Sequence, residues 1–298
     1  MPDEITDRVC EIRPRVVVDG TFGGGGHARR ILQRFDESHD DQKASEAWPS
    51  IRIVGLDRDP DVQRREKEFP LDPRIELFLG SYERTPDALA ACDLPLADAI
   101  VLDLGLSSDQ LEDRHRGFSF NVDGPLDLRF DPENGTSAAQ WLARHNETEI
   151  ADAIYQYGEE RFSRRIARQI VARARDRRPV QTVDDLVQIC RRCVPRSKNH
   201  DIHPATRTFQ ALRIAVNEEL DILERTLSMA AQWLSPGGRL VVISFHSLED
   251  RLVKQAFRDD PRMEVMTKKP IRPGEAEVAA NPRSRSAKLR VAKKKGNG

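Results

Sequence analysis

The sequence predicts an α/β fold with an open, mainly parallel sheet and an all-helical segment inserted into it. Three short apolar runs, 16–19, 51–57 and 97–103, each end in an aspartate, as expected for buried strands leading into a ligand crevice. A cluster of glycines directly follows the first run. The stretch from Gln110 to about Phe130 is irregular, and from Ser137 the apolar residues recur with a helical period, which indicates a change of architecture.

The run Val16–Asp19 carries the most specific local signal. Its three β-branched residues predict a buried strand, and a glycine-rich turn, 20–26, precedes a helix that we expect from Ala28 to about Phe35. Strand, glycine turn and helix are the parts of a nucleotide-type cofactor site, because backbone N–H groups approach a ligand where no Cβ intervenes. A flexible glycine turn without a ligand is the alternative interpretation.

Further strands are expected at 51–57, 74–82, 97–103 and 239–245, with a last edge strand at 288–291. Three of the predicted strands end in Asp19, Asp57 and Asp103. In an open α/β sheet the carboxyl ends of the strands line the ligand crevice, and strand pairing itself gives no reason for acids to recur there. We therefore expect the three carboxylates to share one site.

The helical insertion divides the chain into two predicted domains. Residues 113–205 are expected to form it, and 1–112 with 206–298 the discontinuous sheet domain. A single long helix is predicted from Thr206 to Trp233, and a later helix is expected to begin with Ser247 as its cap.

Charge is distributed unevenly along the 298 residues, although the formal net charge is only −1. Between Arg161 and Arg207 there are 13 basic residues and four acidic ones, and the tail from Arg283 to Lys295 is basic without any acid. Two basic blocks favour a polyanionic partner such as nucleic acid. A solvated helix face and a disordered tail are the alternative. No secretory signal or membrane span is recognisable, so a cytoplasmic location is expected.

The glycine turn is compatible with two cofactor classes. One is a nicotinamide or flavin dinucleotide, and the other is S-adenosylmethionine. An acid before the first glycine, Asp19, would repel a pyrophosphate, whereas it suits a cofactor with a cationic sulfonium and an amino group. This comparison favours an S-adenosylmethionine-dependent methyltransferase. The scattered cysteines, including the Cys190–Cys193 pair, lack the partners of a zinc set, and no metal is expected.

Eight motifs, in order along the chain, resemble the bacterial 16S ribosomal RNA cytosine-N4 methyltransferase family. They include Asp-Gly-Thr-Phe-Gly-x-Gly-Gly-His and Ser-Phe-His-Ser-Leu-Glu-Asp-Arg, and together they occupy 19–27, 56–60, 102–111, 116–120, 123–127, 157–162, 203–214 and 244–251. The resemblance implies a Rossmann-like class I methyltransferase sheet with a helical insertion that recognises RNA. It also implies methyl transfer to the exocyclic N4 of a decoding-site cytosine in 16S rRNA of the small ribosomal subunit.

The resemblance also carries site residues over by position. The cofactor contacts it implies are Gly25, Gly26, His27, Asp57, Tyr82, Asp103 and Gln110. Asp57, at the end of the second predicted strand, is expected to accept hydrogen bonds from ribose hydroxyls. Tyr82, a candidate to stack on the adenine ring or else a half-buried core aromatic, stands where the family commonly has Phe, and Gly24 stands where Arg is common. The family's usual N-terminal His-x-Pro-Val-Leu segment is not visible in residues 1–15.

Asp103 is the candidate catalytic residue, accepting the N4 proton, with a role confined to holding the cofactor as the alternative. Trp141 is a candidate to stack on the base, or else a core residue, and His246 and Ser247 are candidates to touch base or phosphate. A homodimer is left open. Two other functions are also left open: a non-catalytic RNA-binding assembly factor, and a methyltransferase acting on a protein or small molecule.

Overall fold

The chain divides into two compact units. The computed structural model describes residues 1–40, 50–68, 71–120, 122–195 and 203–296. One unit comprises Met1–Gly105 with Asp221–Gly298, and the other comprises Leu106–Leu220. The domain boundaries predicted after residue 112 and before residue 206 both fall inside the second unit. Three charged residues of the basic segment, at positions 196, 198 and 201, lie outside the described residues.

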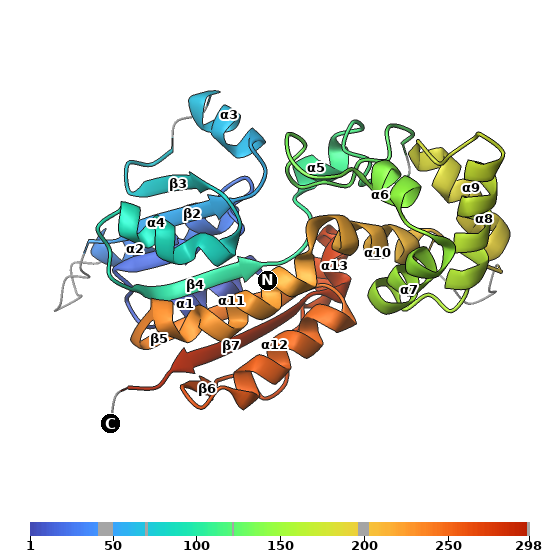
Figure 1. The fold of residues 1–298 in the computed structure, drawn as a ribbon. Helices are drawn as coiled ribbons and strands as arrows, with labels where there is room; N and C mark the ends of the chain where they lie inside the picture. The colour runs from blue at the N-terminus through green and yellow to red at the C-terminus, as the bar shows by residue number, and fades with distance from the viewer. Residues whose placement is uncertain (41–49, 69–70, 121, 196–202, 297–298) are drawn as a thin grey trace. The chain divides into compact units, whose positions relative to one another are not determined.

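A seven-stranded sheet in the order β3-β2-β1-β4-β5-β7-β6 organises the first unit (Figure 1). The strands are β1 (Val16–Asp19), β2 (Arg52–Asp57), β3 (Ile75–Leu79), β4 (Ala97–Asp103), β5 (Leu234–Ser244), β6 (Met263–Val265) and β7 (Lys288–Lys294). The first five pair in parallel, while β7 is antiparallel to both of its neighbours. The last strand expected at 288–291 is confirmed as β7, but its placement at the edge was wrong, because the short β6 pairs along the outer side of β7.

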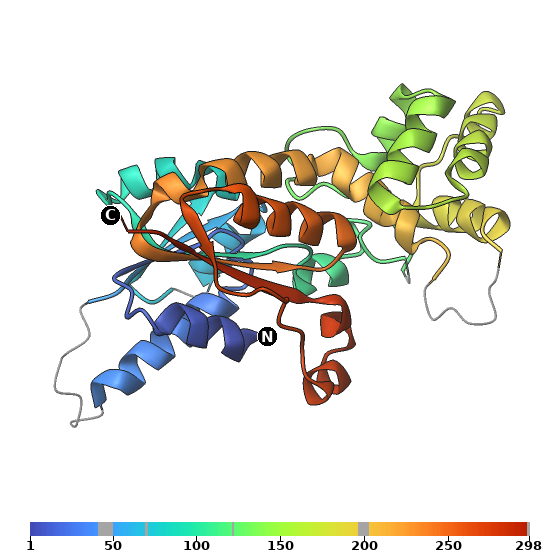
Figure 2. The same ribbon diagram turned by 90° about the horizontal axis from the view of Figure 1, so that it is seen from below.

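Alternating side chains of the strands supply two apolar layers, one on each face of the sheet. One layer packs against α4, α11 and α12, and the other against α1 and α2. Figure 2 shows the blue α1 and α2 below the sheet and the orange α11 and α12 above it. The helices of this unit are α1 (Pro2–Cys10), α2 (Gly26–Asp40), α3 (Asp61–Glu68), η1 (Tyr82–Arg84), α4 (Thr85–Ala91), α11 (Glu219–Trp233), α12 (Ser247–Asp259), α13 (Glu275–Ala280) and η2 (Pro282–Ser286).

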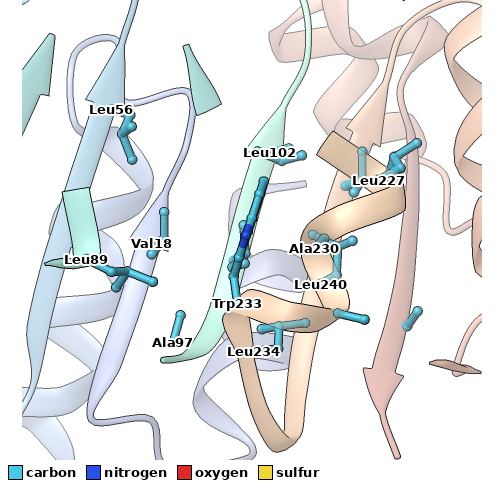
Figure 3. Packing of buried hydrophobic residues seen from close by; sticks show 14 of the residues in the cluster. Val18, Leu56, Leu89, Ala97, Leu102, Leu227, Ala230, Trp233, Leu234 and Leu240 are labelled. Atoms are coloured by element: carbon cyan, nitrogen blue, oxygen red, sulfur yellow. The ribbon is translucent and has the colours of Figure 1, made fainter. Parts of the chain in front are cut away.

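The layer beneath α11 shows how the central strands are held. Trp233 and Leu227 of α11 pack with Leu102 of β4 and Leu240 of β5, and all four side chains are at least nine-tenths buried (Figure 3). Strands covered on both faces are typical of parallel α/β sheets. The carboxyl ends of β1 and β4 are therefore fixed by the core directly behind them.

Helices dominate the second unit. They are α5 (Ser108–Glu112), α6 (Ala138–Arg144), α7 (Glu147–Gly158), α8 (Ser163–Arg175), α9 (Val183–Cys193) and α10 (Thr206–Asn217). The prediction of one helix from Thr206 to Trp233 was wrong, because Glu218 takes a left-handed backbone with φ of 52° and separates α10 from α11. The buried amide of Asn217 holds this break by donating to the Leu128 carbonyl and accepting from the Phe130 N–H, both at 2.7 Å.

Candidate cofactor site

The three strand-end aspartates predicted to share a site do lie at one edge of the sheet. β1 is flanked by β2 and β4, and the register pairs Asp19 with Gly55 on one side and Val101 on the other. Because all three strands are parallel, Asp19, Asp57 and Asp103 end at the same edge. The sheet therefore gathers three carboxylates around the start of the glycine loop.

Backbone and side-chain hydrogen bonds hold the glycine loop in one conformation. The Phe22 N–H donates to the Leu56 carbonyl at 2.9 Å, and the Gly23 N–H donates to Asp57 Oδ2 at 2.7 Å. Gly25 has a left-handed backbone with φ of +70°, and a Cβ there would lie 2.8 Å from the Phe22 ring. Gly26 opens α2, and a Cβ there would meet nothing within 4 Å.

Gly55 is required by this loop, because a Cβ on it would lie 2.5 Å from the buried ring of Phe22. We expect Gly55→Ala to displace that ring, to lower the free energy of unfolding by about 1–3 kcal/mol and to weaken cofactor binding. Urea denaturation and binding calorimetry measure the two effects. Gly274→Ala is the matched control, because a Cβ there would meet nothing within 4 Å. Equal stability of the two variants would contradict this interpretation.

His27, in the first turn of α2, makes the central polar contact of the site. Its Nε2 lies 3.0 Å from Asp103 Oδ2. The Asp103 backbone N–H donates to Thr21 Oγ1 at 2.7 Å, and the Thr21 N–H donates to Asp19 Oδ1 at 3.3 Å. These bonds connect the ends of β1 and β4 with the loop and the helix that follow β1.

Three buried polar atoms of this cluster have no hydrogen-bond partner among the described residues: Asp19 Oδ2, His27 Nδ1 and Asp103 Oδ1. Unpaired buried polar atoms are costly in a folded protein, and such atoms gathered in one place indicate a ligand site. Two carboxylate oxygens repel a phosphate and attract a cation or a hydrogen-bond donor. The residues present therefore fit S-adenosylmethionine, which carries a sulfonium and an amino group, better than they fit a dinucleotide.

Burial and neighbouring charges shift the pKa values of this cluster. Burial raises the pKa of Asp19 to about 6, with His27 and the Thr21 N–H opposing the shift and the negative charges of Asp103 and Asp57 adding to it. Burial acts to lower the pKa of His27, but the hydrogen bond to Asp103 and the negative charges of Asp19 and Asp103 outweigh it and raise that pKa. Burial also raises the pKa of Asp57.

Asp57, predicted to bind the ribose, makes structural contacts of its own at the end of β2. Besides the bond from Gly23, its Oδ1 accepts the Asp59 N–H at 2.9 Å. Asp59 in turn accepts the Asp61 N–H at 3.1 Å at the start of α3, as expected for a helix cap. Asp57 thus braces the glycine loop, and its contact with a ribose stays a prediction.

Tyr82, predicted to stack on the adenine, begins η1 just after β3 and is partly buried against the core. A Cβ on Gly20 would lie 2.8 Å from the Cβ of Tyr82. The start of the glycine loop and Tyr82 are therefore in close contact, which puts the aromatic ring in the same unit as Asp19 and Asp57.

Gln110, the remaining predicted cofactor contact, belongs to the second unit. It is the third residue of α5 and forms a capping box: its Oε1 accepts the Ser107 N–H at 3.1 Å, while Ser107 Oγ accepts the Gln110 N–H at 3.2 Å. This local role accounts for a Ser-x-x-Gln pattern without any ligand. Its contact with the cofactor stays a prediction.

The predicted substrate contacts have structural partners of their own. Trp141 packs against the apolar cluster of the second unit and stacks on His145 with 3.9 Å between ring centroids. His246, rather than Ser247, caps α12, and its Nδ1 accepts the Glu249 N–H at 3.4 Å. The expected cap at Ser247 was wrong by one residue, because Glu249 completes a capping box with His246. Ser247 itself is exposed.

Two residues of the first unit that support the site were not singled out from the sequence. Thr21 carries the bond to the Asp103 backbone. Glu249 is 2% exposed, and its Oε2 accepts the N–H groups of Phe245 at 2.8 Å and His246 at 3.3 Å, which fixes the end of β5. A glutamate three residues after the helix cap His246 is the sequence signal that identifies it.

Within the described ranges, no helix has the length and apolar character needed to cross a membrane. A largely parallel α/β sheet with a glycine loop and carboxylates at its strand ends defines a Rossmann-like methyltransferase. The chain belongs to the MraW methylase family, whose sequence profile matches residues 1–295.

Curated relatives support that assignment over nearly the whole chain. A protein of Rhodopirellula baltica named ribosomal RNA small subunit methyltransferase H is 63% identical over 298 residues, covering 99% of this chain and 90% of the relative. Proteins of the same name from Synechococcus elongatus and Stenotrophomonas maltophilia are 46% and 45% identical. These alignments cover 98% and 93% of this chain and 92% and 87% of the two relatives.

Proposed function

We propose that this chain transfers a methyl group from S-adenosylmethionine to the exocyclic N4 of cytosine 1402 in 16S rRNA of the small ribosomal subunit. The observation that carries the proposal is the group of three unpartnered buried atoms on Asp19, His27 and Asp103. The names of the full-length relatives support the rRNA substrate. The reaction then takes place in the cytoplasm, with the small subunit as partner.

Most of the site residues of the first unit bind the cofactor, and Asp103 accepts the proton. Gly25 and Gly26 lead into α2, whose first N–H groups lack intrahelical acceptors and suit the carboxylate of the cofactor. Asp57 binds the ribose hydroxyls, Tyr82 stacks on the adenine, and Asp19 faces the positive charge. Gln110 stays a cofactor contact that the family resemblance alone implies.

The cofactor supplies a methyl group activated by a sulfonium sulfur, which keeps the electron pair of the broken C–S bond and becomes a neutral thioether. Asp103 accepts a hydrogen bond from N4, which localises the nitrogen lone pair for formation of the N–C bond. The proton lost from N4 then passes to the Asp103 carboxylate. His27 holds Oδ2 of that carboxylate, so Oδ1 is the atom offered to the base.

Transfer of a tritiated methyl group separates this proposal from its alternatives. Small subunits that lack the modification are incubated with the chain and labelled cofactor, and the RNA and protein fractions are counted separately. We expect the label in 16S rRNA. Label in protein or in small molecules would favour another methyltransferase activity, and binding to the subunits without any transfer would favour an assembly factor.

Exposed arginines on α8 of the second unit make a surface suited to RNA phosphates. Arg164, Arg168 and Arg175 recur at i, i+4 and i+11 and are exposed, whereas Ile166 and Ile170 on the other side are buried. In the C-terminal basic block, Lys288 and Arg290 of β7 both form ion pairs with Asp250 of α12 within the protein, so their charges are already neutralised. We therefore assign the RNA contact to the helical unit and not to the tail.

We expect subunit binding to weaken steeply with salt, with the slope of log K against log salt reduced by about one for each phosphate contact removed. Arg164→Gln and Arg175→Gln should each reduce the slope by about that amount. Filter binding at 50–300 mM salt measures it, and Arg285→Gln in the tail is the control. A tail variant that reduces the slope as much as the α8 variants would contradict this assignment.

The homodimer left open by the sequence is tested separately: light scattering of the purified chain gives its mass, which distinguishes a monomer from a dimer.

A further inference from the structure

His27 lies in a buried environment shaped by charges from three elements. Asp103 at the end of β4 is in direct contact, and Asp19 at the end of β1 adds a second negative charge. Arg30, on the same helix as His27, opposes both, and Asp57 at the end of β2 acts on Asp19. The histidine therefore compensates the charge of the fully buried Asp19 and of the partly exposed Asp103.

The geometry fixes which ring nitrogen gains or loses a proton. Nε2 lies 3.0 Å from Asp103 Oδ2, so it keeps its hydrogen whenever that carboxylate is ionised. Nδ1 is buried and has no hydrogen-bond partner among the described residues. A second proton on the ring must therefore reside on Nδ1, inside the cluster that we propose binds the cofactor.

We propose that His27 couples the charge of the bound cofactor to its own protonation: binding of the cationic methyl donor expels a proton from His27 Nδ1 to the buffer, and the neutral thioether product lets that proton return. The inference rests on the proposed function. The negative charges of Asp103 and Asp19 stabilise a positive charge beside them. The imidazolium of His27 and the sulfonium of the donor repel each other there, so the presence of one disfavours the other. Because linkage is reciprocal, the proton weakens binding of the donor as much as the donor weakens binding of the proton.

The direction of the pH dependence follows from the raised pKa of His27. Below that pKa the imidazolium opposes a cationic ligand, so affinity for the donor rises with pH, by about tenfold per pH unit at most, and levels off above it. Asp19, with a pKa of about 6, also loses a proton when a cation binds. Measurements at pH 7.5 separate the two groups, because Asp19 is already ionised there.

Calorimetry of donor and product binding at pH 7.5, in buffers of different ionisation enthalpy, counts the protons released. S-adenosylmethionine and S-adenosylhomocysteine are the probes. We expect release of a fraction of a proton with the donor and a smaller release with the product. His27→Gln keeps an amide donor for Asp103 but does not titrate, so at pH 7.5 it should abolish the release, and it should flatten the pH profile of donor affinity above pH 7, where Asp19 is ionised. His115→Gln, at an exposed position, should leave both unchanged.

Equal proton release with donor and product, or release that persists in His27→Gln, would overturn the inference. If that variant does not fold, NMR titration of the His27 ring in the wild-type chain replaces it. The pKa of His27 should fall by at least about one unit when the donor binds, and an unchanged pKa would overturn the inference. Absence of any donor binding to the wild-type chain would contradict the proposed function and this inference with it.

Discussion

Asp103→Asn should lower the rate of methyl transfer at saturating cofactor by about 10²- to 10⁴-fold, the usual contribution of a positioned proton acceptor. The substitution keeps the shape of the side chain, and its amide oxygen can still accept the hydrogen of His27 Nε2. The variant should therefore fold and bind the donor with an affinity within tenfold of the wild type. Single-turnover transfer and calorimetry measure the two quantities separately.

Asp87→Asn is the matched control, because Asp87 lies on the exposed side of α4 in an ion pair with Arg84. It should transfer methyl groups at the wild-type rate. If a higher cofactor concentration restores the rate of Asp103→Asn, the role of Asp103 is confined to holding the cofactor, and its assignment as proton acceptor is wrong.

Asp19→Asn should stabilise the protein without ligand while weakening donor binding by tenfold or more. The pKa of the buried Asp19 is raised from 3.8 to about 6, so the folded state holds its proton more tightly than the unfolded chain. The associated stability is present below pH 3.8 and is lost as the pH rises through 6. At pH 7.5 the ionised carboxylate then costs about 3 kcal/mol, which an uncharged Asn avoids.

Chemical denaturation at pH 7.5, 5.0 and 4.0 tests this prediction. The variant should exceed the wild type in free energy of unfolding by about 2–3 kcal/mol at pH 7.5, and the difference should shrink toward zero at pH 4.0. Asp87→Asn again serves as the control, with no gain at any pH. A difference that does not depend on pH would show that packing, and not the buried charge, sets the stability of Asp19→Asn.

The gathering of the three carboxylates was predictable because each lies at the end of an apolar run that is recognisable in the local sequence. Apolar runs that end in Asp19, Asp57 and Asp103 indicate neighbouring parallel strands, and parallel strands bring their carboxyl ends to one edge. The bond between His27 and Asp103 was not predictable, because it depends on which strand lies beside β1. The sheet order, with β4 next to β1, decides that contact.

Other differences between expectation and structure have equally specific causes. The first helix, α1, was missed although Ile5 and Val9 are fully buried, because two apolar residues give a weak periodic signal among polar neighbours. The break at Glu218 interrupts a continuous helical pattern, and it depends on the distant contact of Asn217 with the 128–130 backbone. Contacts between residues far apart in the chain leave no periodicity in the sequence.

Nucleoside analysis of 16S rRNA shows directly whether the chain methylates N4 of cytosine. Small subunits that lack the modification are incubated with the chain and S-adenosylmethionine, and the rRNA is digested to nucleosides and separated by mass spectrometry. We expect one N4-methylcytidine per subunit with the wild-type chain and a loss of about 10²- to 10⁴-fold in its rate of formation with Asp103→Asn. Methylation at carbon 5 of cytosine, or no methylated cytosine at all, would contradict it.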